Sequence, residues 1–119
     1  MIDLKDLTVV TGTNVIPTAS VKLIIEGREY ISSETGVGPV DAAIKAIQKV
    51  TGEMIKVQLR EFRLEALTGG SNAFAEVIIK VEDVKGKVAS ARASKQDIVI
   101  ASVEAMINGL NTLLQMGKR

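Results

Sequence analysis

The chain has 119 residues, which suits one domain with a hydrophobic core but leaves no room for a separate catalytic domain beside it. Fifteen basic residues face fourteen acidic ones, and the only aromatic residues are one Tyr and two Phe, so nucleic-acid binding by charge or stacking is not expected. His and Cys are absent, which removes the commonest general base, the commonest metal ligand and all thiol chemistry.

Hydrophobic residues make up 46% of the chain, close to the globular average. No apolar run approaches the roughly 20 residues that cross a bilayer. The first residues, Met1 to Leu4, do not resemble a signal peptide. The lack of Cys fits a reducing compartment. We therefore expect a soluble, cytoplasmic protein with no membrane or nucleic-acid partner, no cofactor and no catalytic or metal-binding residues.

The sequence contains an internal repeat, because the segment 27–47 is matched 59 positions later by the segment 86–106. The matching apolar positions are Val40, Ala42, Ile44, Ala46 and Ile47 in the first copy and Val99, Ala101, Val103, Ala105 and Met106 in the second. The pattern predicts an α+β fold of two pseudo-symmetric βββα units, approximately 1–52 and 53–119, with antiparallel sheets packed on helices. Since duplicated units commonly pack about a pseudo-two-fold axis, we expect a ligand-binding crevice between them.

The first copy opens with a predicted strand over residues 4–10, followed by a turn-rich connection through Pro17. Residues 19–25 alternate between apolar and other side chains with period two, which is typical of a half-buried strand. Gly27-Arg28 is predicted to form the turn, and residues 29–33 to return as the partner strand.

A helix is predicted to begin after Gly36 and Gly38, because Pro39 suits its first position, and to end near Gly52. Asp41 falls in the first turn, where its charge meets the positive end of the helix dipole. The backbone amides of residues 36–40 could receive a ligand carboxylate, or the glycines could serve the turn alone.

The second copy opens with a strand whose apolar side chains change phase. They occupy Ile55, Val57 and Leu59 and then, beyond Glu61, Phe62, Leu64 and Ala66. This change predicts a bulge or strong bend that re-aims Phe62. A loop at 68–72, a strand at 73–81, a turn at 83–86 and a strand at 87–94 follow, in the order of the first copy.

The last predicted helix spans about 97–116 and carries a stripe of large apolar residues with a period near 3.6. Ala101, Ala105 and Gly109 form a second stripe of small residues at four-residue spacing. Burial on two sides predicts a homodimer with the helices between the sheets of two subunits. The alternative is that alanine was selected here for its helix propensity alone.

Three segments carry a family resemblance. They are Gly36-Val37-Gly38-Pro39-Val40-Asp41-Ala42, then Glu61-Phe62-Arg63-Leu64-Glu65-Ala66-Leu67-Thr68-Gly69-Gly70, and then Asp97-Ile98-Val99-Ile100-Ala101-Ser102 with Asn111 following. In this order, on duplicated units, they resemble the C-terminal regulatory domain of alpha-isopropylmalate synthase and citramalate synthase. The resemblance covers almost the whole chain and implies a single regulatory domain over residues 1–119.

The resemblance implies a dimeric domain that binds an end-product amino acid, leucine or isoleucine, and thereby inhibits a TIM-barrel acyltransferase domain of the same enzyme. That barrel condenses acetyl-CoA with a 2-oxo acid and needs a divalent metal held by a His-x-His pair. A chain without His cannot provide this metal site. We expect the sensor without the enzyme, either as an excised fragment or as a separately encoded subunit.

By the same resemblance the ligand would lie near the start of the first helix, against the bent strand and the start of the second helix. The implied amino-acid-binding residues are Gly36, Gly38, Val40, Asp41, Leu59, Phe62, Ala66, Ala73, Ser94 and Gln96. Asp41 would bind the ligand's ammonium group, although a helix-dipole role explains it without a ligand. Core packing equally explains Leu59 and Phe62.

The sequence departs from the family pattern at three places. Val37 replaces a common Asn, Phe62 a common Tyr, and Lys95-Gln96 a common Ser-Pro pair. The small residues at Ala66 and Ala73 favour leucine over isoleucine. Two other hypotheses stay open, a ligand-free structural dimerisation module and a small enzyme that uses Asp41 or Glu61 as a base.

Overall fold

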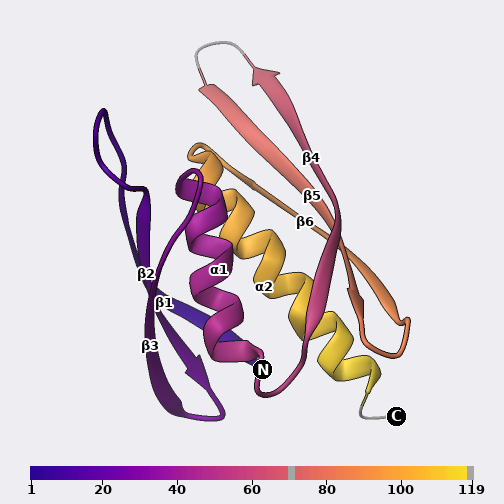
Figure 1. The fold of residues 1–119 in the computed structure, drawn as a ribbon. Helices are drawn as coiled ribbons and strands as arrows, with labels where there is room; N and C mark the ends of the chain where they lie inside the picture. Colours follow the sequence, from indigo (N-terminus) through magenta and orange to yellow (C-terminus); the bar gives the residue numbers. More distant parts are fainter. Residues whose placement is uncertain (70–71, 118–119) are drawn as a thin grey trace. The chain divides into compact units, whose positions relative to one another are not determined.

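The chain folds into two compact units, Met1–Lys56 and Val57–Arg119, each with three strands followed by a helix (Figure 1). This computed structural model describes the backbone of residues 1–69 and 72–117 and the side chains of 1–67 and 74–117. The predicted α+β class and the duplicated βββα order are confirmed. The predicted repeat boundary at residue 52 lies in the connection that precedes the second unit.

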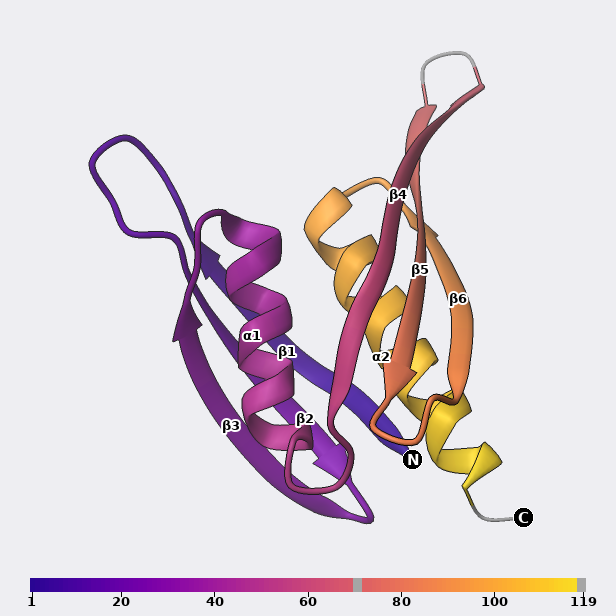
Figure 2. The same ribbon diagram turned by 45° about the vertical axis from the view of Figure 1, so that its right-hand side comes forward.

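In unit 1, strands β1 (Ile2–Val10), β2 (Thr18–Ile25) and β3 (Arg28–Thr35) form an antiparallel sheet in the order β1-β2-β3. Helix α1 (Pro39–Thr51) lies against one face of this sheet, mainly over β2 and β3 (Figure 2). The buried apolar residues of β2 and α1 are Ala19, Val21, Leu23, Ile25, Ala42, Ala43, Ile44, Ala46 and Ile47. Their periods of two and about 3.6 explain why these segments fold as a strand and a helix.

The hairpin between β2 and β3 turns at Glu26 and Gly27, one residue earlier than predicted. Both residues have positive φ angles, 52° and 78°, as in the tight two-residue turns that match the twist of a hairpin. Ile25 pairs with Arg28, so Arg28 already belongs to β3. Glycine at 27 removes the steric cost of this backbone conformation.

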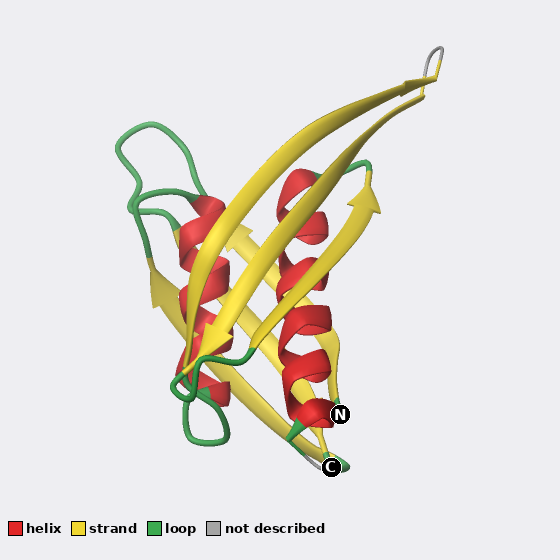
Figure 3. Cartoon of the chain, turned by 90° about the vertical axis from the view of Figure 1, so that its right-hand side faces the viewer, coloured by secondary structure: helices red, strands yellow, loops and turns green. Residues whose placement is uncertain are grey.

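In unit 2, strands β4 (Val57–Gly69), β5 (Asn72–Asp83) and β6 (Val88–Lys95) form the second antiparallel sheet, in the order β4-β5-β6. Helix α2 (Ile98–Met116) packs on β5 and β6, and within the described residues it makes no close backbone approach to β4. The β4–β5 hairpin extends past the start of α2 (Figure 3). The core of this unit includes Val77, Ile79, Val81, Ala89, Val103, Met106 and Leu110.

Strand β4 contains the predicted bulge. Its pairing with β5 shifts between Leu59 and Glu61, so that Arg60 is the extra residue. Because of this insertion, Leu59 and Phe62 pair with Val81 and Ile79 and lie on the same face of the sheet. The prediction of a bulge that re-aims Phe62 is therefore confirmed.

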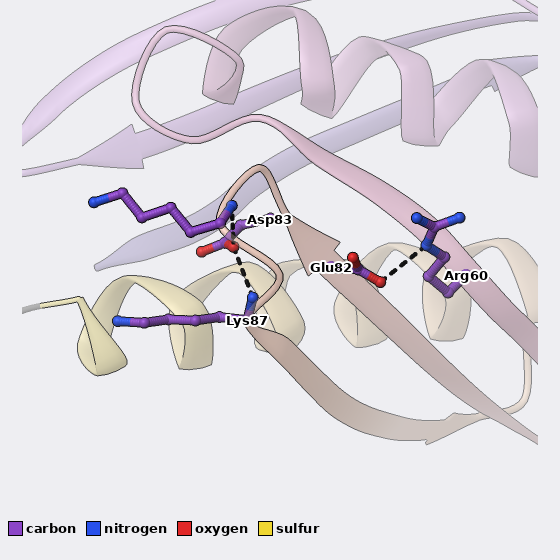
Figure 4. Close-up of polar contacts among 5 residues, drawn as sticks. Arg60, Glu82, Asp83 and Lys87 are labelled. Carbon is purple, nitrogen blue, oxygen red and sulfur yellow. Dashed lines mark hydrogen bonds and ion pairs between the residues drawn. The ribbon is translucent and has the colours of Figure 1, made fainter.

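Polar contacts hold the strand and turn next to this bulge (Figure 4). Arg60 Nε donates to Glu82 Oε1 at 3.1 Å, across β4 and β5. The following turn is closed by Asp83, whose Oδ1 accepts the backbone N–H groups of Lys85 and Lys87, each at 2.9 Å. Asp83 therefore fixes the turn that leads from β5 into β6.

Helix α2 begins at the cap residue Asp97, whose Oδ1 accepts the N–H groups of Val99 and Ile100 at 2.8 and 3.0 Å. A Cβ at Gly109 would meet Ile79 and Val81 side chains at 3.1 Å. Part of the small-residue stripe therefore lets α2 approach its own sheet, although a partner subunit was predicted to cover this side of the helix.

Helix α2 is long and apolar enough to cross a membrane by length and mean hydropathy, contrary to the expectation that no apolar run approaches that length. It has 19 residues, and its most apolar stretch has a mean hydropathy of 1.3, but half of that stretch is buried inside the protein. The core helix of a folded domain has the same properties, and α2 packs on β5 and β6.

Candidate functional site

The predicted amino-acid-binding residues fall into two groups, one in each unit. Gly36, Gly38, Val40 and Asp41 precede or begin α1. The other residues lie on the strands of unit 2 or, for Gln96, between β6 and α2. Each group has its own local geometry.

The carboxylate of Asp41 is already engaged within unit 1. Its Oδ2 accepts the backbone N–H of Val37 at 3.0 Å and pairs with Lys45 Nζ at 3.1 Å, one turn along α1. The hydrogen bond from Val37 and the ammonium group of Lys45 hold the pKa of Asp41 below its ordinary value, although partial burial opposes the shift. Asp41 thus stabilises the start of α1 without a ligand, and among the described residues both of its contacts use Oδ2, which leaves Oδ1 open.

The two glycines of this turn have different roles. A Cβ on Gly36 would lie 2.5 Å from the backbone N of Ala42 and 2.6 Å from Asp41 Oδ2, so only glycine fits against the start of α1. Gly38 is the N-cap of α1, with an extended backbone and open space around its Cα. Close packing therefore explains Gly36, whereas Gly38 has no steric requirement.

The predicted carboxylate-binding amides at 36–40 are partly used by the protein. Gly36 N–H donates to Pro17 O at 3.0 Å, and Val37 N–H donates to Asp41. Pro39 has no N–H group. This leaves at most the amides of Gly38 and Val40 for an anion at this helix N-terminus.

In unit 2, several predicted residues share the face of the sheet that carries α2. Leu59, Phe62 and Ala66 pair with Val81, Ile79 and Ala75, and cross-strand partners project to the same side. We call Leu59, Phe62, Leu64 and Ala66 the β4 strip. Because α2 covers β5 and β6, Phe62 and Leu64 keep 37% and 50% of their surface exposed.

A shallow hollow of about 340 Å³ lies beside the distal end of the β4 strip. It is lined by Leu64, Glu65, Ala66, Phe74, Ala75 and Gln96, most of them apolar. The structure thus brings together two predicted residues, Ala66 and Gln96. Leu64, Phe74 and Ala75 were not among the site residues predicted from the sequence. The alternation that follows Glu61 already placed Leu64 in phase with Phe62 and was the available signal for it.

Ser94 lies on the other face of the same sheet. It pairs with Glu76, and its Oγ donates to Glu76 Oε2 at 3.4 Å. Ser94 is therefore not grouped with the β4 strip. The backbone of Ala73 pairs with Thr68, but its side chain lies outside the described residues.

A role for Asp41 or Glu61 as a catalytic base requires a desolvated carboxylate without a neighbouring cation. Asp41 pairs with Lys45, and Glu61 Oε2 lies 3.6 Å from Arg63 Nε. Within residues 1–69 and 72–117, no group of three or more acidic residues is arranged to hold a metal ion. The geometry gives the enzyme hypothesis no support.

Comparisons with known proteins identify the family. Residues 1–114 match the model of the LeuA allosteric (dimerisation) domain. The chain is 50% identical over 118 residues to a probable 2-isopropylmalate synthase of Methanosarcina acetivorans, covering 99% of the chain and 23% of that protein. A 2-isopropylmalate synthase of Methanocaldococcus jannaschii is 51% identical over 114 residues, covering 96% of the chain and 21% of that protein.

A putative (R)-citramalate synthase of Methanothermobacter thermautotrophicus is 46% identical over 114 residues, covering 96% of the chain and 22% of that protein. The chain therefore spans less than a quarter of the length of these relatives. It corresponds to their regulatory portion, and the catalytic domain lies outside these residues. The chain belongs to the family of LeuA allosteric (dimerisation) domains.

Proposed function

We propose that this domain binds free leucine, or alternatively isoleucine, and mediates feedback inhibition of a 2-isopropylmalate or citramalate synthase in branched-chain amino acid biosynthesis. The main support is the hollow beside Ala66 and Gln96. Its volume of about 340 Å³ lies at the small end of the range for small-molecule sites. Its apolar walls suit an aliphatic side chain, and Gln96 supplies a polar group at the edge.

In unit 2, the β4 strip and Ala73 are proposed to contact the aliphatic part of the ligand. In unit 1, Asp41 Oδ1 is proposed to bind the ammonium group of an amino acid at the start of α1, since Oδ2 is used by Val37 and Lys45. The amides of Gly38 and Val40 are proposed to bind the carboxylate.

The regulatory step is proposed to act through a homodimer on the catalytic barrel of the same enzyme, in the cytoplasm. Effector binding favours one dimer arrangement, and the bias passes along the chain to the catalytic domain. Couplings of this kind amount to about 1–3 kcal/mol, or roughly 5–150-fold in affinity. No chemistry in the regulatory domain is needed for such an effect.

Isothermal titration of this chain with leucine, isoleucine and valine tests the proposal. Leucine and valine differ by one methylene group, so valine should bind roughly 10–200-fold more weakly. The Ala66→Leu variant fills the hollow and should lose leucine binding. Ser90→Ala is the matched control, because Ser90 pairs with Lys80 toward the other end of β6 and does not line the hollow, so the substitution should leave binding unchanged.

The alternative function is a structural dimerisation module without a ligand. It is favoured by the internal roles of Gly36 and Asp41, which need no effector. If the domain is such a module, titration with any of the three amino acids should give no heat of binding, and the mass of the dimer should not depend on them. Sedimentation with and without leucine, run beside the titration, separates the two functions.

A further inference from the structure

A second hollow of about 430 Å³ lies in unit 1, beside the C-terminal end of α1. Tyr30 and Ser32 of β3 line one side of it, and Lys49, Val50 and Glu53 line the other. We call it the α1-end hollow. The unit 1 residues predicted to bind the amino acid precede or begin α1, and Asp41 lies about 12 Å along the helix from Lys49 of the hollow.

Ser32 gives this hollow an unused hydrogen-bonding group. Only 8% of its surface is exposed, and its Oγ has no hydrogen-bond partner. Ser32 pairs with the core residue Val21 on β2, so it lies on the sheet face that carries α1. A buried hydroxyl without a partner destabilises the fold, and such groups call for an explanation.

The internal repeat indicates that the fold itself does not require a hydroxyl at position 32. The positions of unit 2 that match Ser32 and Lys49 at the 59-residue spacing are Ala91 and Asn108. Asn108 is satisfied within unit 2, since its Nδ2 donates to Arg92 O at 3.3 Å. Ala91 has no side-chain polar group. The buried hydroxyl of Ser32 is therefore specific to unit 1.

The charges around the hollow favour a cation. Lys49 Nζ is paired with Glu34 Oε2 at 3.7 Å, which neutralises the one basic side chain in the lining. Glu53 has no ion pair among the described residues. The C-terminal end of α1 adds the negative end of a helix dipole, and Tyr30 in the lining is an aromatic residue of the kind that binds cations.

We propose that the α1-end hollow binds a small molecule with an ammonium group. The ammonium group donates to the Glu53 carboxylate and to Ser32 Oγ, whose buried hydroxyl turns toward the hollow on binding, and the alkyl part packs on Val50 and Tyr30. This site goes beyond the proposed regulatory function and does not depend on it.

Three probes of matched shape test the charge preference by NMR on the full chain: n-butylammonium, n-butanol and butyrate. Saturable shifts of the amides of Ser32, Val50 and Glu53 are expected with butylammonium alone. The Glu53→Gln variant should weaken this binding about tenfold or more, the loss expected when a charged hydrogen-bond partner is removed. The control variant Glu61→Gln removes an acidic charge from unit 2 and should leave the binding unchanged.

Ser32→Ala tests the hydroxyl directly and should fold, because alanine occupies the matching position of unit 2. It is expected to raise the thermal midpoint and to weaken butylammonium binding. The Ala66→Leu variant should keep butylammonium binding even where it abolishes leucine binding. Equal shifts with all three probes, no saturation, or full binding by Glu53→Gln or Ser32→Ala would each overturn the proposal.

Discussion

Replacement of Gly36 by alanine is the sharpest test of the geometry at the start of α1. The added Cβ would lie 2.5 Å from Ala42 N, 2.8 Å from Ala42 Cα and 2.6 Å from Asp41 Oδ2. Two of these atoms belong to the backbone, so a side-chain rotation cannot relieve the contacts. The turn before α1 must shift, and the hydrogen bond from Val37 N–H to Asp41 is lost with it.

The expected cost follows from these two effects. Overpacking of a well-packed site costs about 1–3 kcal/mol. Loss of a side-chain acceptor at a helix start adds about 0.5–2 kcal/mol, and we use the lower part of this range because Asp41 is partly exposed. The Gly36→Ala variant should therefore lose about 2–4 kcal/mol, a large share of the 5–15 kcal/mol typical of a domain.

Gly38→Ala is the matched control, because a Cβ at Gly38 meets no atom within 4 Å and its backbone is extended. It should change stability by only about 0.5 kcal/mol, as surface substitutions usually do. The midpoints of urea denaturation of the two variants are compared, on condition that the free energy of unfolding falls with urea concentration at the same slope in both. Equal midpoints for the two variants would refute the close approach of Gly36 to α1.

Three further predictions concern the helix caps and the bulge. Asp97→Ala should cost about 0.5–2 kcal/mol in urea denaturation, because two N–H groups lose their acceptor, whereas Asp97→Ser should keep most of the stability. Deletion of Arg60 should remove the bulge and leave Leu59 paired with Val81 and Phe62 with Ile79, because Leu59 and Phe62 then stand two residues apart in a regular strand; NMR shifts confined to residues next to the deletion would support this, and shifts that extend to Leu64 and Ala66 would contradict it. The pKa of Asp41 is lowered in the folded state, so its contribution to stability is present above the ordinary value of 3.8 and is lost as the pH falls through the lower folded value. Asp41→Asn should therefore flatten the loss of stability as the pH falls below about 4, and an unchanged acid profile would refute the role given to this carboxylate.

The order of the elements could be predicted because it depends on local patterns. The period-two burial of residues 18–25 and the Pro39 start of α1 are properties of adjacent residues, and the structure confirms both. The bulge at Arg60 was also visible, because a change of phase within one strand needs no knowledge of the neighbouring strands. The turn at Glu26-Gly27 was misplaced by one residue, since a glycine fits several positions of a tight turn.

The side on which a residue lies depends on pairing between strands, and this limited the prediction of the site. Ser94 was grouped with Ala66, yet its pairing with Glu76 puts it on the other face of the sheet. The exposure of Phe62 depends on which strands α2 covers, a non-local property. Gly36 was interpreted as a flexible turn residue, whereas its nearest constraint is the backbone of Ala42, six positions along the chain.

Both candidate sites lie where the two copies of the repeat differ. Strands β4 and β5 have 13 and 12 residues, against nine and eight in β1 and β2, and the added length carries the hollow beside Ala66. In unit 1 the difference is chemical, since Ser32 replaces the alanine found at position 91 of unit 2. The residues that the two copies share explain the fold. Both sheets also contain a bulge in their first strand, after Leu4 in β1 and after Leu59 in β4. The fold depends less on the residues that differ between the two copies. Substitutions at Ala66 and Ser32 should therefore change ligand binding more than the stability of the fold.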